Sequence, residues 1–206
     1  MGEEHRLLQG NAVSRGIAMA EAYVYEPLDL TIIKGICTKE EVETECKRFY
    51  DAMNRAKDEL ERLYDILEKE HPEQAKIFAA HKELLDDEEM IEETENAIKE
   101  DCLTAESAVD MIFNQYAELL KQVEDPLIAG RAADLLDVKR RVLRLLLGKE
   151  EKKLDYFERD VIVVAHDLLP SDTANLDRGH VKGLITEAGG SNSHCAILAR
   201  SFSYTY

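Results

Sequence analysis

Apolar residues recur at alternating intervals of four and three positions through residues 42–67. The members of this series are Val42, Cys46, Phe49, Met53, Ala56, Leu60, Leu63 and Leu67. Such spacing places the apolar side chains along one side of an α-helix. Thr38 followed by Glu41 has the spacing of a capping box just before the series. The pattern predicts one long helix with a single apolar stripe, which needs other helices to cover it.

Four more helical segments are predicted downstream of this first one. One opens at Pro72, an acidic one contains Met90, Ile91 and Ile98, one is capped by Thr104, and one runs from Pro126 to a stop at Gly148. Helices joined by short connections favour antiparallel neighbours, so the five segments predict an antiparallel helical bundle.

Strand-like patterns flank this helical region on both sides. Residues 7–13 and 16–25 precede it, whereas residues 160–165 and 181–186 follow it with a short helix, 170–176, between them. The first two strands have no sheet of their own to join. They are therefore expected to pair with the last two strands.

The expected fold class is thus α and α/β. An α/β domain is built from residues 1–36 and 149–206, and a helical domain of residues 37–148 is inserted into it.

Composition narrows the possible partners. The 206 residues are 45% apolar and 33% charged, with a net charge of −17. This charge repels nucleic-acid phosphates and anionic lipid, and favours a basic protein partner. No apolar run is long enough for a membrane span and the start lacks the features of a signal peptide, so a cytoplasmic location is expected. The cysteines, Cys37, Cys46, Cys102 and Cys195, show no C-x-x-C pair, so we expect reduced thiols and no zinc site or disulfide framework.

The residues with the clearest chemical character lie near the end of the chain, where Gly-Gly-Ser-Asn-Ser-His occupies positions 189–194 between a predicted strand and a predicted helix. Helix N-termini bind anions, and glycines let the backbone approach them closely. Ser191 and Ser193 offer hydroxyl donors, and a neutral His194 imidazole can attack phosphorus. The alternative is that Ser193 only caps a helix and His194 is an ordinary surface residue.

The wider motif, Gly-Gly-x-x-Ser-His-x-Ala-Ile-x-Ala-Arg, resembles the phosphohistidine signature of the phosphoenolpyruvate-utilising family. Residues 167–177 resemble the segment that faces this histidine. Residues 78–88 and 131–138 resemble the helical insert of Enzyme I of the sugar phosphotransferase system, and residues 13–18 resemble its opening strand. The resemblance implies a swivelling phosphohistidine domain with an inserted helical domain, spanning the N-terminal half of Enzyme I.

The resemblance also implies roles for individual residues. His194 would be phosphorylated by phosphoenolpyruvate and would pass the phosphoryl group to the carrier protein HPr, with the Thr173 hydroxyl bonded to the histidine. Gly190, Ser191, Ser193 and Arg200 would bind phosphate, although a structural role for Arg200 is equally open. The matching HPr surface would include Phe78, His81, Leu84, Leu85, Asp87, Glu88 and Arg131, and some of these residues must belong to the core.

Two departures from the family pattern stand out. Ser191 and Asn192 replace a basic residue and a threonine, and Leu169 replaces a threonine. The barrel domain that binds phosphoenolpyruvate and magnesium and forms the dimer in Enzyme I is not in the sequence, so no cofactor or metal is expected in this chain.

Three other classes of protein stay open. A pyruvate phosphate dikinase would share only the region around His194 and usually carries a nucleotide-binding domain, for which no glycine-rich loop is present. A non-catalytic helical binding module would leave His194 unlabelled. A serine or cysteine hydrolase is disfavoured because Ser191 lacks the G-x-S-x-G frame.

Overall fold

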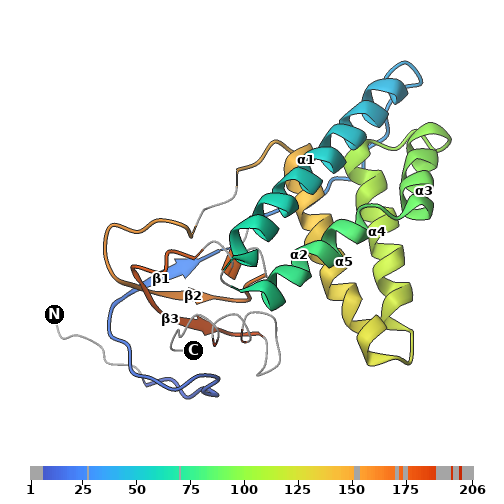
Figure 1. Cartoon of the computed structure of the whole chain (residues 1–206). Coiled ribbons are helices and arrows are strands. Elements are labelled where there is room, and N and C mark those ends of the chain that lie inside the picture. Colours follow the sequence, from blue (N-terminus) through green and yellow to red (C-terminus); the bar gives the residue numbers. More distant parts are fainter. Residues whose placement is uncertain are drawn as a thin grey trace. The chain divides into compact units, whose positions relative to one another are not determined.

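Two compact units make up the chain (Figure 1). One combines residues 1–26 with residues 153–206, and the other is Pro27–Lys152. The computed structural model describes residues 7–26, 28–69, 71–150, 154–169, 172–173, 176–188, 196 and 200.

The second unit is helical and extends beyond the expected insert, 37–148, at both ends. Its first residues are held by the body of the unit: the Gly35 N–H donates to Ser107 Oγ at 2.9 Å, and the Thr104 N–H donates to the Gly35 carbonyl at 3.1 Å. Lys149 Nζ donates to the Asp29 carbonyl at 2.5 Å. These bonds join the segments before the first helix and after the last to the helical unit.

Five helices form this unit, as the sequence pattern predicts. They are α1 (Val42–Glu68), α2 (Pro72–Leu84), α3 (Glu88–Lys99), α4 (Ala105–Lys121) and α5 (Pro126–Leu146). α1 packs against α2 and α5, and α4 packs against α3 and α5. Gly148 follows α5 with a φ of 60°, and its N–H donates to the Leu145 carbonyl at 3.2 Å, so the predicted stop at glycine is confirmed.

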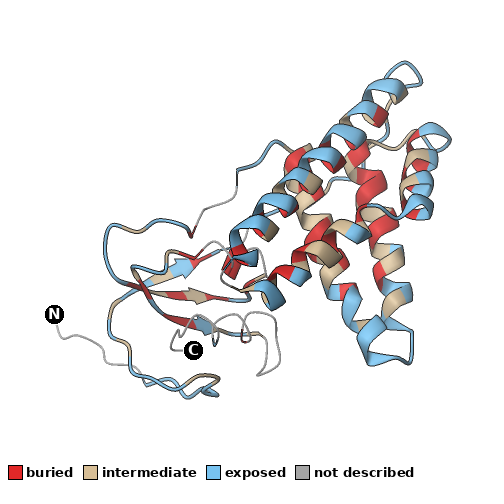
Figure 2. Ribbon diagram, in the orientation of Figure 1, coloured by how far each residue is buried: buried red, intermediate tan, exposed pale blue. Residues whose placement is uncertain are grey.

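The apolar stripe of α1 forms the core of the bundle together with buried residues of the other helices (Figure 2). Seven of its eight predicted members are buried, from Cys46 to Leu67, and Val42 is half-buried. Glu59 ties the outer side of α1 to α5, because its Oε2 accepts from Arg141 at 2.6 Å and from Arg144 at 2.5 Å.

The capping box before α1 forms only in part. The Glu41 carboxylate accepts the Thr38 N–H at 2.8 Å, as in the motif, but it also accepts the Thr38 hydroxyl at 3.0 Å. The hydroxyl therefore bonds the carboxylate and does not cap the helix.

The α/β unit contains a three-stranded parallel sheet in the order β1 (Glu21–Tyr25), β2 (Val161–Ala165) and β3 (Val181–Thr186). β1 lies beside β2, so the predicted pairing of N-terminal and C-terminal strands is confirmed. The core of this unit consists of Tyr25, Leu154, Val161, Val163, Ala165, Leu168, Leu176, Val181 and Leu184.

Of the two predicted N-terminal strands, one is absent and the other is shorter than predicted. Residues 7–13 form no strand, with Leu7 fully exposed, and the second predicted strand is reduced from 16–25 to β1. A strand needs a partner for its backbone groups, and β2 offers one only to residues 21–25. Apolar alternation alone therefore overestimated the sheet.

Candidate functional site

The three parallel strands end at one level. Tyr25 pairs with Ala165, which in turn pairs with Thr186, so the carboxyl ends of all three strands form one edge of the sheet. In open parallel sheets, ligands bind at this edge, where the loops after the strands meet. The loops that follow β2 and β3 carry the segments singled out in the sequence.

A buried hydrogen-bond network holds the loop after β2 against this edge. The Tyr25 hydroxyl donates to Asp172 Oδ1 at 2.9 Å, and the Leu169 N–H donates to Asp172 Oδ2 at 2.9 Å. Tyr25 is 2% exposed and Asp172 is 9% exposed. A buried carboxylate that accepts two hydrogen bonds fixes the position of its loop, and here it adjoins Thr173.

Thr173 is one of the predicted catalytic residues, and its side chain is buried in the turn that Asp172 anchors. Its hydroxyl donates to the Leu169 carbonyl at 3.3 Å. Leu169, a departure from the family pattern, contributes its backbone N–H and carbonyl to the turn. These two backbone contacts do not depend on the side chain at this position.

The chain leaving β3 stays bonded to the chain leaving β2. The Glu187 N–H donates to the Ala165 carbonyl at 3.1 Å, and the Ala188 N–H donates to the His166 carbonyl at 2.8 Å. His166 Nδ1 lies 3.0 Å from Glu187 Oε2, and both side chains are exposed. The Gly-Gly-Ser-Asn-Ser-His motif begins directly after Ala188, so it starts from the same edge as Thr173.

Four of the predicted site residues, Gly190, Ser191, Ser193 and His194, lie outside the described residues, and so does Asn192. Arg200 is described as helical, and its Nε donates to the Ala196 carbonyl at 3.1 Å. This contact within its own segment accords with the structural alternative. The predicted bond between Thr173 and His194 stays a prediction.

The predicted partner-binding residues of the helical unit separate into two groups. Phe78, His81 and Leu85 are each at most 1% exposed, so the expectation that they offer an apolar surface is wrong. Burial against the neighbouring helices explains this: His81 Nε2 lies 3.4 Å from Asp134 Oδ1, and its ring meets the Phe78 ring edge-on at 5.9 Å.

The remaining members of that predicted surface are accessible. Leu84 is half-buried, and Asp87, Glu88 and Arg131 are exposed. Asp87 also caps α3, because its Oδ1 accepts the Met90 N–H at 2.9 Å. This carboxylate therefore serves the fold as well as the surface charge.

Apolar side chains that the sequence reading missed are exposed around the turn between α4 and α5. Leu119, Leu127 and Ile128 are 61%, 84% and 41% exposed. The signal was the pair Leu127–Ile128 directly after Pro126, in the first turn of a helix, where side chains project beyond the bundle.

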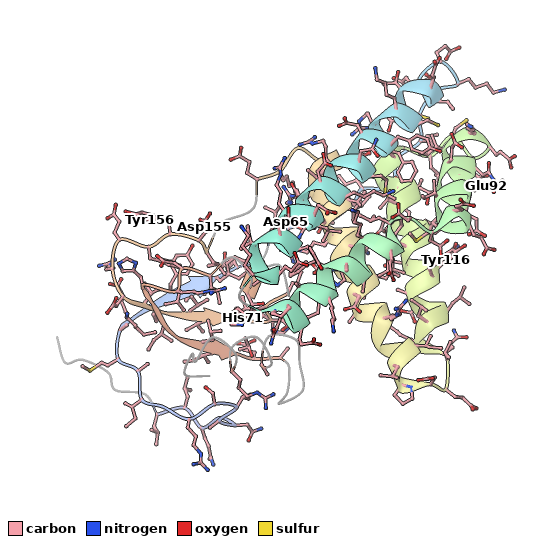
Figure 3. The ribbon with its side chains drawn as sticks, viewed as in Figure 1. Asp65, His71, Glu92, Tyr116, Asp155 and Tyr156 are labelled. Atoms are coloured by element: carbon pink, nitrogen blue, oxygen red, sulfur yellow. The ribbon has the colours of Figure 1, made fainter. Side chains whose placement is uncertain are left out.

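A groove between α3 and α4 adjoins this turn. Its volume is about 750 Å³, and its lining is Glu89, Glu93, Asn114, Gln115, Tyr116, Glu118, Leu119 and Gln122. Tyr116 lies on α4 and Glu92 on the facing helix α3 (Figure 3). Burial, followed by the charges of Glu93, Glu89 and Asp87, raises the pKa of Tyr116 to about 12. The groove is therefore strongly negative.

Within the described ranges, no helix has both the length and the hydropathy needed to cross a membrane. The same ranges contain no group of three or more His, Cys, Asp or Glu side chains arranged to hold a metal ion.

Comparison with known proteins identifies the family. A family model described as the N-terminal domain of PEP-utilising enzymes matches residues 9–131. The chain belongs to the PEP-utilising enzymes. A second model, described as the mobile domain of PEP-utilising enzymes, matches residues 157–205. The predicted family resemblance is thus confirmed.

Curated relatives of this PEP-utilising chain include several phosphoenolpyruvate-protein phosphotransferases. Phosphoenolpyruvate-protein phosphotransferases of Priestia megaterium and Bacillus subtilis are 39% and 40% identical to it over 195 residues, which is 94% of this chain. The chain spans 34% of the length of each.

Solved structures show the same fold. A solution NMR structure of an Enzyme I protein (nEIt) has 38% identity and a TM-score of 0.83, covering 96% of this chain and 80% of that one. An N-terminal domain of Enzyme 1 - Nitrogen has 24% identity and a TM-score of 0.67, over 94% and 79% of the two chains. The predicted fold class is confirmed.

Proposed function

We propose that this chain carries a phosphoryl group on His194, between phosphoenolpyruvate and the carrier protein HPr of the sugar phosphotransferase system. The phosphoenolpyruvate site, magnesium and dimer contacts belong, in this proposal, to the further domain that Enzyme I carries. Family membership and relatives named phosphoenolpyruvate-protein phosphotransferase support this function over a hydrolase or a binding module.

One structural observation carries the proposal. The turn with Thr173 is anchored at the carboxyl edge of the sheet by the Tyr25–Asp172 hydrogen bond, and the His194 motif leaves the same edge after Ala188. A rigid hydroxyl beside a histidine can orient the imidazole for attack. After the transfer it can still form a hydrogen bond with the ring, as donor or as acceptor.

The transfer step follows from these groups. A lone pair on a neutral His194 ring nitrogen attacks phosphorus, the phosphorus–donor bond breaks, and the donor leaves with that electron pair. The phosphoryl oxygens are then received by backbone N–H groups and by the Ser191 and Ser193 hydroxyls. Transfer to HPr is the reverse of accepting the group from phosphorylated HPr.

Phosphohistidine mapping tests the chemistry. The chain is incubated with phosphorylated HPr and analysed by intact mass and peptide mapping under neutral or basic conditions. We expect one phosphoryl group on His194, none after His194→Ala, and normal labelling of His166→Ala, which removes an exposed histidine from the same sheet edge. Label on another histidine would overturn the assignment. Without an added domain, phosphoenolpyruvate should not label the chain.

The structure also revises where HPr is proposed to dock. Residues 82–101 contain ten Asp or Glu and two Lys. Leu119 lines the groove with Glu89 and Glu93 of α3, and it is followed by the exposed Leu127 and Ile128 in the first turn of α5. We propose these three residues as the apolar centre in place of the buried Phe78, His81 and Leu85. We call Asp87, Glu88, Glu89, Leu119, Leu127, Ile128 and Arg131 the α3–α5 surface. An apolar centre with an acidic rim fits a basic protein partner.

Binding kinetics across a salt series test this surface. Long-range attraction accelerates encounter, so association with HPr should slow as salt rises while dissociation changes little. Glu88→Lys should slow association in the same way. Glu88 is the better site for charge reversal because Asp87 also caps α3. The matched control is Asp65→Lys, a reversal at an exposed residue of α1 (Figure 3).

Truncation of the apolar centre tests the other half of the surface. Leu127→Ala should accelerate dissociation without unfolding the chain, because Leu127 is 84% exposed. Ile66→Ala, which truncates an exposed residue of α1, is the control and should leave dissociation unchanged. Equal effects of the two variants would remove the α3–α5 surface from the proposal. The proposal that His194 is phosphorylated does not depend on that result.

A further inference from the structure

Two cysteines lie opposite each other where the segment before α1 meets the loop between α3 and α4. Ile36 and Leu103 form an isolated antiparallel bridge. On one side of it the Cys37 N–H donates to the Cys102 carbonyl at 2.7 Å, and on the other the Thr104 N–H donates to the Gly35 carbonyl at 3.1 Å. This hydrogen-bond pattern makes Cys37 and Cys102 directly opposed cross-strand neighbours.

Directly opposed residues of an antiparallel pair have Cα atoms roughly 4.5–5.5 Å apart. Disulfides form across Cα separations of roughly 4.4–6.8 Å. The two backbones are therefore already at the separation that a disulfide requires. Both thiols are free and only partly buried, so oxidants can reach them.

Burial first, and then the nearby Cys102 side chain, raises the pKa of Cys37 above its ordinary value. The backbone conformation at position 102 does not favour cysteine. Cys102 has a φ of 52°, a region that glycine and asparagine occupy more readily.

We propose that Cys37 and Cys102 are an oxidation site, at which a peroxide or a small disulfide converts the two thiols into a reversible disulfide. The bond would fasten the segment that enters α1 to the loop that enters α4. In the reduced protein hydrogen bonds make this connection, among them a contact of 3.7 Å from Cys37 Sγ to the Leu103 carbonyl.

The chemistry balances with either oxidant. With hydrogen peroxide, one thiolate attacks an oxygen and becomes a sulfenic acid, and the second sulfur then attacks that sulfur and releases water. Both thiol protons and the peroxide oxygens leave as two molecules of water. With a small disulfide, the first thiolate forms a mixed disulfide and the second displaces the remaining small thiol.

Cys46 is the competing partner within the described residues. It lies near Cys37 but belongs to the buried stripe of α1, where it is 9% exposed. No backbone hydrogen bond aligns it with Cys37 as the bridge aligns Cys102. A disulfide to Cys46 would require the N-terminal end of α1 to move.

Oxidation of the complete chain by hydrogen peroxide or oxidised glutathione, at protein concentrations low enough to suppress dimers, tests the site. We expect a mass lower by about 2 Da, a Cys37–Cys102 linked pair in peptide maps made without reductant, and recovery of both thiols with dithiothreitol. The double variant Cys46→Ala/Cys195→Ala should behave in the same way. Cys37→Ser and Cys102→Ser should each abolish the linked pair.

Thermal unfolding supplies the second measurement. A disulfide restricts the unfolded chain, so oxidation should raise the Tm of the native chain and of Cys46→Ala/Cys195→Ala, but not that of Cys37→Ser. A linked pair that contains Cys46 or Cys195, or two thiols that both survive the oxidant, would overturn the proposal.

Discussion

Replacement of Tyr25 by phenylalanine isolates the hydrogen bond that anchors the candidate site. The change removes one hydroxyl and keeps the ring, so the core around Tyr25 retains its volume and no cavity forms. The hydroxyl donates at 2.9 Å to the carboxylate of Asp172, and both residues are buried. A buried hydrogen bond to a charged group contributes about 1.5–3 kcal/mol, so we expect Tyr25→Phe to destabilise the α/β unit by about 2 kcal/mol.

Hydrogen exchange of β2 is the suitable assay, because β1 and β3 both bond to that strand and its amides open when the sheet opens. A loss of about 2 kcal/mol corresponds to roughly 30-fold faster exchange. Amides of the helical unit should keep their native rates, since that unit is a separate compact body.

Tyr23→Phe is the matched control. It removes the same atom from the same strand, where the Tyr23 ring contacts Phe157 edge-on at 5.0 Å. Exchange in β2 should therefore change little in this variant. If Tyr23→Phe and Tyr25→Phe accelerated exchange equally, or if neither did, the Tyr25–Asp172 bond would not be the anchor of the edge.

Three further predictions concern the helical unit. Gly148→Ala should destabilise it by about 1 kcal/mol in urea titrations, because Gly148 has a φ of 60°. Gly130 is exposed within α5, so Gly130→Ala should stabilise the unit by about 0.5–1 kcal/mol. Since burial and then Glu93 raise the pKa of Tyr116 to about 12, the unit should lose stability as the pH rises from about 10 to about 12. Absorbance titration of tyrosinate should show the Tyr116 pKa falling in Glu93→Gln. Burial opposes ionisation of Glu59, but hydrogen bonds from two arginines of α5 lower its pKa, so the stability that Glu59 contributes should be lost as the pH falls below about 4.3. Glu59→Gln should cost about 1.5–3 kcal/mol at pH 7 and reduce the loss of stability in acid, as measured by Tm against pH.

Helices were predictable where one buried side requires apolar residues at helical spacing in the sequence. The stripe of α1 repeats with the period of a helix for its whole length, and glycine and proline mark where α5 ends and begins. The extent of β1 was not predictable in this way. It depends on which residues β2 can bond, and β2 lies far along the chain.

The docking surface implied by the family resemblance included residues that the fold buries. Phe78 and His81 on α2 and Leu85 at its C-cap recur at helical spacing, and this pattern is the same whether a partner protein or the protein's own bundle covers the residues. Burial decides between the two, and burial is a property of the assembled unit. Leu127 gave the opposite case, an apolar residue left exposed in the first turn of α5.

The Tyr25–Asp172 bond could not be read from the sequence, since 147 positions separate its two residues. Neither residue belongs to a local motif that indicates the other. The motif around His194, in contrast, is continuous in the sequence, and its resemblance to the phosphohistidine signature singled it out. Sequence thus supplied the candidate reacting group, and the structure showed what anchors the turn with Thr173.

Separate compact units imply that docking and transfer can be altered independently. The α3–α5 surface belongs to the helical unit, and the sheet edge belongs to the α/β unit. In single-turnover transfer from phosphorylated HPr, Glu88→Lys should therefore raise the half-saturating carrier concentration and leave the maximal rate unchanged. Tyr25→Phe should lower the maximal rate and leave half-saturation unchanged, because it loosens the turn with Thr173 in the α/β unit and removes nothing from the α3–α5 surface. If Glu88→Lys lowered the maximal rate as strongly as Tyr25→Phe does, the acidic rim would take part in the transfer step itself, and the assignment of docking to one unit and chemistry to the other would fail.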